Sequence, residues 1–206
     1  SGLGRLGEAS ISTGTVLAAM ALVDQVIPHS GCYHGPHFDG VRYYRLAFDP
    51  RGAGQLESYQ RRFAPNRSLE ELLALAALAA PGGLTDGEPN PDLSDRAHGV
   101  FVRQILEHIA AAHRELIGQV MGSRTLNTIV ATGGGARSPL WLQIKAAMLN
   151  ATILKPHCEE LACLGAAMLA GVGGSIFQGL DEASHAFVRE EVRYVPEPGL
   201  VDIYRE

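Results

Sequence analysis

The sequence is first notable for what it lacks. Its 206 residues contain three cysteines, at Cys32, Cys158 and Cys163, and no CxxC pair. This excludes a disulfide framework and a zinc ribbon, and it is typical of proteins in a reducing cytosol, so we expect a cytoplasmic location. The longest apolar runs, 16–23 and 72–80, are far shorter than the ~20 residues of a membrane-spanning helix. The N-terminus lacks the basic segment of a signal peptide, and we expect no membrane partner.

An excess of basic residues is also missing. The chain has 17 Lys and Arg against 22 Asp and Glu, giving a formal net charge of −5, so nucleic acid is not an expected partner. Hydrophobic residues make up 46% and charged residues 19%, which excludes a disordered or fibrous chain. The length allows one large domain or two small ones.

Several familiar catalytic motifs are absent. No Walker A sequence, GxSxG elbow or HExxH pair occurs. Cys32, His34 and His37, with His29 nearby, lie in a segment rich in Gly and Pro, but their spacing is irregular and a fourth ligand is not evident. We therefore interpret these histidines as solvated loop residues and expect no metal site.

Periodicity and turn residues predict an α/β protein with some parallel strand pairing. In the first half we expect a strand over 8–15, a strand or short helix over 16–26, a loop over 29–39, a strand over 41–48, and helices over 55–63 and 68–80, the last capped by Ser68. In the second half we expect a long helix with one buried stripe over 96–121, a buried strand over 126–131, a glycine turn, a helix over 138–149, a strand over 151–154 and a helix over 159–170.

The most informative local feature is the triple glycine Gly133-Gly134-Gly135, between a predicted strand and the predicted helix that Ser138 caps. Glycines let the backbone pass close to a ligand, and free N–H groups at a helix N-terminus suit anionic ligands. The alternative is a tight turn with nothing bound. The residues also nearly match a dinucleotide fingerprint, but Ser138 replaces its third glycine and the next strand ends at Lys155 instead of an acidic residue, so this match is weak.

Two further segments have a functional and a structural interpretation. The turn Ser12-Thr13-Gly14-Thr15 could donate hydrogen bonds to phosphate oxygens, or could be a capped hairpin. The small residues of 164–171 are typical of a helix packed closely on a sheet, and less often of one that contacts a ligand.

Taken together, these segments resemble the C-terminal domain of the FGGY carbohydrate kinases, in the actin-like ATPase (ribonuclease H-like) superfamily. The sequences TIVATGGGARSPLWLQIKAAMLNATI and ELACLGAAMLAG carry the resemblance, supported by ASISTGT near the N-terminus. The stretch 53–59 is similar to an AG-x-x-x-x-W segment with Tyr59 in place of Trp, and 81–95, with Gly87-Glu88, is like a shortened GER loop. The resemblance covers nearly all of residues 1–206.

The resemblance implies roles for particular residues. Thr15 should approach the nucleotide phosphates, Gly54 and Ser58 should lie beside the nucleotide, and Gly134 and Ser138 should contact the adenosine. Ala147 stands where the family commonly has Asp, and Ser58 stands where some relatives have a longer amide.

The resemblance also implies what lies outside this chain. The family's N-terminal domain holds most of the sugar pocket and the catalytic Asp, which would precede Ser1, so we expect half of an ATP- and Mg²⁺-dependent enzyme with no catalytic residue of its own. Its implied partners are ATP or ADP and a sugar or polyol, and a homodimer is left open. A non-catalytic nucleotide- or sugar-binding protein and an NAD-binding oxidoreductase domain are the alternative hypotheses.

Overall fold

The computed structural model describes residues 6–26, 31–50, 52, 54–83, 88–158, 160–187 and 190–205. Predictions that involve His29, Ala53, Gly87 and Glu159 fall outside the described residues. The elements, in chain order, are β1 (Glu8–Thr13), β2 (Leu17–Val23), β3 (Tyr33–Pro36), β4 (Tyr43–Asp49), α1 (Gly54–Phe63), α2 (Leu69–Leu78), α3 (Asp95–Met121), β5 (Thr128–Thr132), the 3₁₀ turn η1 (Gly134–Arg137), α4 (Pro139–Leu149), β6 (Thr152–Pro156), α5 (Leu161–Gly173), α6 (Leu180–Phe187), β7 (Glu190–Tyr194) and α7 (Pro198–Ile203).

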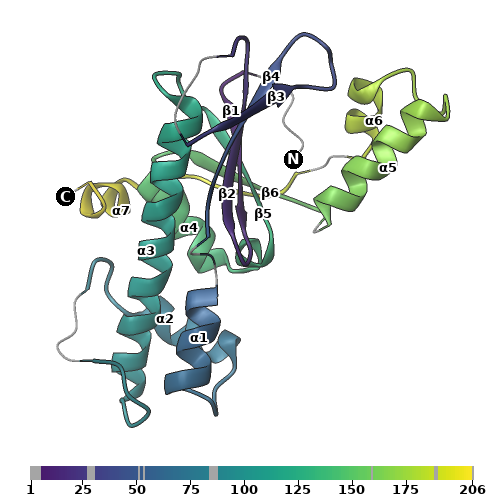
Figure 1. Cartoon of the computed structure of the whole chain (residues 1–206). Helices are drawn as coiled ribbons and strands as arrows, with labels where there is room; N and C mark the ends of the chain where they lie inside the picture. The colour runs from purple at the N-terminus through teal and green to yellow at the C-terminus, as the bar shows by residue number, and fades with distance from the viewer. Residues whose placement is uncertain are drawn as a thin grey trace.

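The centre of the molecule is a mixed seven-stranded sheet in the order β3-β4-β2-β1-β5-β6-β7 (Figure 1). Strands β1, β5 and β6 are parallel to one another, and the remaining pairs are antiparallel. The segment for which strand and helix were both open is strand β2, where the alternate residues Leu17, Ala19 and Ala21 are completely buried. The predicted mixed sheet flanked by helices is therefore confirmed.

Helix α3 crosses the sheet and continues beyond it, where α1 and α2 pack against its other end (Figure 1). The predicted helix and its single buried stripe are confirmed, because the buried residues recur at helical spacing, at 98, 102, 106, 109, 113, 116 and 120 with some of their direct neighbours. Ile109, Leu116 and Val120 are buried as expected, whereas Val100 and Phe101 are only partly buried. The contacts of α3 with α2, α4, β2 and β4 are therefore made along this one stripe and its flanks.

Helix α2 begins as the sequence predicts. The Ser68 Oγ accepts a hydrogen bond from the backbone N–H of Glu71, and the Glu71 side chain accepts one from the backbone N–H of Ser68, so the two residues form a capping box. This reciprocal pair satisfies two of the N–H groups that a helix N-terminus leaves without an internal partner.

Two predictions about local structure are corrected. The segment 29–39, predicted to be loop, contains strand β3, which pairs with β4 at one edge of the sheet. Helix α5, predicted to pack closely on the sheet, instead makes most of its contacts with α6, and Gly171 is its one buried residue within the described part. A Cβ at Gly171 would lie 2.7 Å from the Phe177 ring, so this small residue packs against the following loop.

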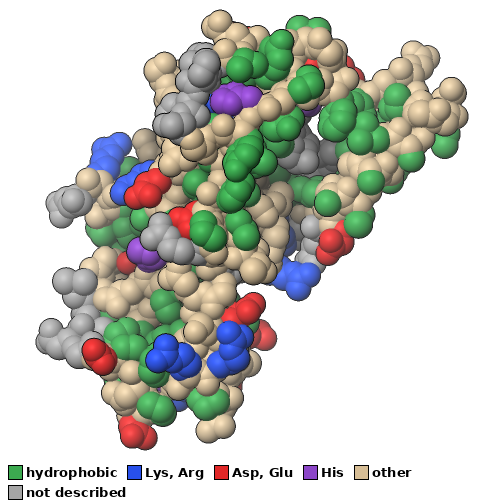
Figure 2. Space-filling view, viewed as in Figure 1, with side chains coloured by type: hydrophobic (Ala, Val, Ile, Leu, Met, Phe, Trp, Pro, Cys, Tyr) green, Lys and Arg blue, Asp and Glu red, His purple; other side chains and the backbone are tan. Residues whose placement is uncertain are grey.

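Helices α5 and α6 consequently stand apart from the rest of the molecule, and hydrophobic side chains reach the surface of this arm (Figures 1 and 2). Leu169 is 41% exposed and Ile176 is 73% exposed. Within the described residues, we find no helix with both the length and the hydrophobicity that crossing a bilayer requires.

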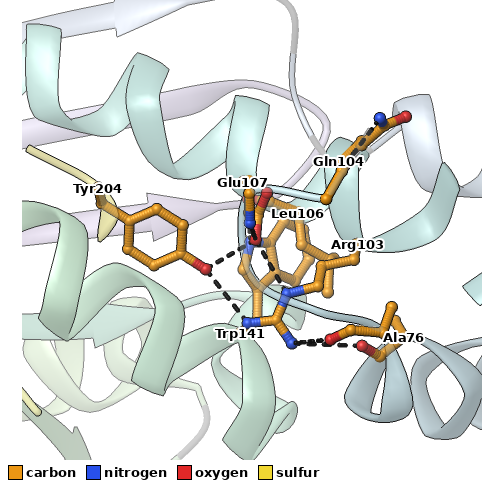
Figure 3. Close-up of polar contacts among 10 residues, drawn as sticks. Ala76, Arg103, Gln104, Leu106, Glu107, Trp141 and Tyr204 are labelled. Carbon is orange, nitrogen blue, oxygen red and sulfur yellow. Dashed lines mark hydrogen bonds and ion pairs between the residues drawn. The ribbon is translucent and has the colours of Figure 1, made fainter. Parts of the chain in front are cut away.

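The C-terminal helix α7, which was not predicted, packs against α4, and the residue after it is bonded to α3 by a polar cluster shown in Figure 3. Buried Arg103 donates to the Glu107 carboxylate over 2.9 Å, to the Ala79 carbonyl over 3.1 Å and to the Tyr204 hydroxyl over 3.2 Å. Tyr204 in turn donates to the Glu107 carboxylate over 2.7 Å. These bonds connect the end of α2, the middle of α3 and the residue after α7.

Candidate nucleotide site

The main hollow of the domain lies where two turns of the sheet meet the helical end of the molecule. It has a volume of about 920 Å³, within the range of small-molecule sites. Its lining comes from the β1–β2 turn (Thr13, Gly14, Thr15), helices α1 and α2 (Gly54, Leu56, Glu57, Leu69, Glu70, Leu73, Ala74), and the glycine turn with the start of α4 (Gly134, Gly135, Arg137, Ser138, Pro139, Leu140, Trp141).

The first wall is a hairpin turn, so the structural interpretation of Ser12-Thr13-Gly14-Thr15 is correct as to its shape. Strands β1 and β2 pair as far as Thr13 and Leu17, and the Gly14 N–H donates to the Val16 carbonyl over 3.3 Å. Thr13 is buried, while Thr15 is exposed and lines the hollow. A hairpin and a ligand-facing turn are therefore compatible at this position.

The second wall is the triple glycine, whose backbone packs on the first turn. Gly133 has a φ of +79°, and a Cβ there would lie 2.7 Å from the Thr13 carbonyl oxygen. A Cβ at Gly135 would lie 2.6 Å from the Thr13 side chain. A Cβ at Gly134 would meet nothing within 4 Å, and this residue lines the hollow. The outer glycines are therefore required by packing, whereas Gly134 leaves open space.

Ser138 begins helix α4, as predicted. Its Oγ accepts a hydrogen bond from the Trp141 backbone N–H over 3.3 Å, with Pro139 at the first helical position. Ser138 also lines the hollow, so its side chain both caps the helix and faces the hollow.

The start of α1 separates this hollow from a second one of about 690 Å³. Thr15 and Gly54 line both hollows, while Ser58 and Tyr59 line only the second. Four of the five predicted site residues (Thr15, Gly54, Gly134, Ser138) therefore share the main hollow, and Ser58 lies on the adjoining surface.

A buried polar cluster beneath the two turns was missed from the sequence. Lys145 of α4 is completely buried, and its Nζ donates to Thr13 Oγ1 over 2.5 Å and lies 4.5 Å from the centre of the Trp141 ring. On the neighbouring helix α3, His113 is also completely buried, with its Nε2 3.2 Å from the Ser12 carbonyl oxygen. The available signal was that Lys145 is the one charged residue in the apolar helix PLWLQIKAAML.

Burial shifts both ionisable groups toward their neutral forms. Desolvation lowers the pKa of Lys145 from 10.5 to about 7. Desolvation, and secondarily the nearby Lys145, lowers the pKa of His113 from 6.5 to about 3. His113 is therefore neutral at physiological pH, and Lys145 titrates close to it.

The described residues contain no group of three or more His, Cys, Asp and Glu side chains placed to hold a metal ion. In the segment considered for a metal site, the Cys32 thiol donates to the Gln119 carbonyl over 3.6 Å, and the His37 Nδ1 lies 3.1 Å from the Asp39 carboxylate. The Cys32 thiol therefore contacts helix α3, and His37 contacts a neighbour in its own loop.

Comparison with known proteins identifies the family. Residues 6–174 match the family described as "FGGY family of carbohydrate kinases, C-terminal domain". The chain belongs to this family. It is 31% identical to the xylulose kinase of Bacillus subtilis (strain 168) over 183 residues, which is 79% of this chain and 37% of that protein.

Solved structures show the same fold. The chain resembles a ligand-bound xylulose kinase from Lactobacillus acidophilus with a TM-score of 0.82 and 20% identity, covering 97% of this chain and 45% of that one. It resembles Plasmodium falciparum glycerol kinase with ADP with a TM-score of 0.74 and 19% identity, covering 93% of this chain and 43% of that one. The predicted actin-like ATPase fold is confirmed, and the FGGY domain spans less than half the length of these relatives.

Proposed function

We propose that this FGGY domain is the nucleotide-binding half of an ATP-dependent carbohydrate kinase, which transfers the γ-phosphoryl group of ATP to a sugar or polyol hydroxyl. The observation that carries the proposal is the hollow in which the exposed Thr15, the open backbone at Gly134 and the start of α4 face one space. The Plasmodium relative with ADP supports a nucleotide as the occupant.

The residues present fit a nucleotide. Gly134 allows a flat or bulky ligand to approach the backbone, because no atom occupies the space where a side chain would begin. Thr15 is exposed beside it and offers a hydroxyl donor for phosphate oxygens. The N-terminus of α4 contributes the positive end of a helix dipole.

The same residues account for what this half can contribute to phosphoryl transfer. Transfer requires positioning, neutralisation of phosphate charge, and a base for the attacking hydroxyl. The two turns position the nucleotide and donate hydrogen bonds to it. We propose that the base and most sugar contacts come from an N-terminal half. Because the described residues form no carboxylate cluster, Mg²⁺ would be bound by phosphate oxygens and by ligands from that half.

Trp141 provides a direct binding assay, because it is the single tryptophan of the chain and lines the hollow. We expect ADP and ATP to change its fluorescence saturably, and NADH to bind more weakly. Gly134→Leu should weaken nucleotide binding without unfolding the domain, because the open space admits the side chain. Gly118→Leu is the matched control, since Gly118 is an exposed helical glycine with equally open space.

Activity is tested by coupled ADP release across pentoses, hexoses and polyols, on this chain and on a full-length protein that contains it. We expect sugar-dependent turnover only when both halves are present, because losing a positioned general base alone commonly costs about 10²–10⁴-fold. Robust turnover by the 206-residue chain would contradict the proposed division of labour. Unchanged nucleotide binding by Gly134→Leu would show that the hollow is not the nucleotide site.

A further inference from the structure

Lys145 is an unusual residue to find in the core of this domain. Its side chain is completely buried, and its amine contacts one hydroxyl and one aromatic ring, those of Thr13 and Trp141. Within the described part of the chain, no carboxylate forms a salt bridge with it, and desolvation alone accounts for its lowered pKa. An unpaired buried ammonium is costly, and a core position of this kind is ordinarily apolar.

Lys145 lies next to both walls of the main hollow. Thr13, which accepts its hydrogen bond, directly precedes the Gly14-Thr15 turn. Gly135 packs on the same two side chains as Lys145, because a Cβ there would lie 2.6 Å from Thr13 and 3.1 Å from Trp141. The amine therefore lies beneath the point where the two turns meet.

We propose that Lys145 is a positioning residue that connects α4 to the first turn and provides, from beneath both turns, a positive charge complementary to the phosphates of the bound nucleotide. The inference rests on the proposed nucleotide-binding function. It explains why a cation lies here although, among the described residues, no carboxylate forms a salt bridge with it, since the nucleotide would bring a negative charge.

Two consequences separate this role from a merely structural one. First, an electrostatic contribution increases with the charge of the ligand, so replacing Lys145 should affect ATP more than ADP, and adenosine least. Second, a bound polyphosphate favours the charged amine, so nucleotide binding should be accompanied by proton uptake at Lys145.

The pH dependence follows from the groups around the amine. On α3, His113 is the ionisable side chain that interacts with Lys145, and its low pKa keeps it neutral above pH 6. From β1 the contact is the Thr13 hydroxyl, and burial is the cause of the lowered pKa of Lys145. Affinity for ADP should therefore be greatest below pH 7 and decrease as the pH rises and the free form loses its proton.

The test compares the wild-type chain with Lys145→Met, which keeps an unbranched buried side chain and removes the charge. We expect a loss of affinity on the order of tenfold for ATP, a smaller loss for ADP, and less than about twofold for adenosine. Ile144→Val is the control, because Ile144 is a completely buried neighbour on the same helix, and its truncation changes packing without charge. Thermal unfolding without ligand should show Lys145→Met to be at least as stable as wild type.

The pH profile gives a second measurement that needs no variant to fold. We expect the ADP dissociation constant of wild type to rise by up to about tenfold per pH unit above pH 7, and the adenosine constant to stay flat. Where Lys145→Met folds, its ADP profile gives the effect of the titration of the nucleotide's own phosphate, and this effect is subtracted from the wild-type profile. Equal losses for adenosine and ATP, or a flat wild-type ADP profile, would overturn the inference alone. Failure of wild type to bind any nucleotide would overturn the proposed function itself.

Discussion

Replacing Arg103 by methionine should destabilise the domain more than any surface charge substitution. Arg103 is 5% exposed and forms an ion pair with Glu107, whose side chain is 12% exposed. It also donates to the carbonyls of Ala76 and Ala79 where α2 ends, and to the Tyr204 hydroxyl. The substitution keeps most of the apolar stem but leaves a nearly buried carboxylate without its cation.

The magnitude follows from these contacts. Removing one partner of a buried ion pair typically costs about 3–5 kcal/mol, because the remaining charge is desolvated and unpaired. For a domain of this size, that corresponds to a decrease in Tm of roughly 6–20 °C. Tyr204→Phe, which keeps the ion pair and removes one hydroxyl, should cost about 1–3 kcal/mol.

The assay is urea and thermal unfolding of wild type, both variants and a control. Arg61→Met is the matched control, because Arg61 forms an exposed ion pair with Glu57 over 3.8 Å, with side chains 69% and 57% exposed. Such pairs contribute about 0–1 kcal/mol. We expect the order of destabilisation to be Arg103→Met, then Tyr204→Phe, then Arg61→Met. An Arg103→Met variant as stable as the control would refute the assignment of this cluster as the attachment of α7.

Two other predictions concern the site. Gly135→Ala should destabilise the domain by about 1–3 kcal/mol in chemical unfolding, because the new methyl group would lie 2.6 Å from buried Thr13, and a loss below 0.5 kcal/mol would mean that the turns are not packed as described. Burial lowers the pKa of His113 to about 3 from an unfolded value near 6.5, so unfolding takes up a proton there. The contribution of His113 to stability should be complete above pH 6.5 and decrease as the pH falls towards 3. His113→Gln should reduce the slope of the free energy of unfolding against pH in this range by up to the value for one bound proton. An unchanged slope would show that other groups cause the decrease.

The sequence by itself determined the local structure and the family. The Ser68 cap of α2, the Ser138 cap of α4 and the strand-forming residues of β1 and β4 depend on neighbouring residues, so their signals are local and were correctly interpreted. The glycine turn and the small-residue helix gave the FGGY resemblance because their order and spacing are conspicuous in the sequence.

Tertiary structure decided how those elements are arranged. Strands β3 and β7 are the two edge strands of the sheet and pair with β4 and β6. Tyr204, which follows α7, is bonded to α3. The stability of these segments therefore depends on their tertiary partners. Helix α5 has the composition of a packed helix but lies against α6, since composition does not specify a partner. Lys145 looks like an ordinary helix residue in the sequence, and only the convergence of α4 with the two turns buries its amine beneath the candidate site.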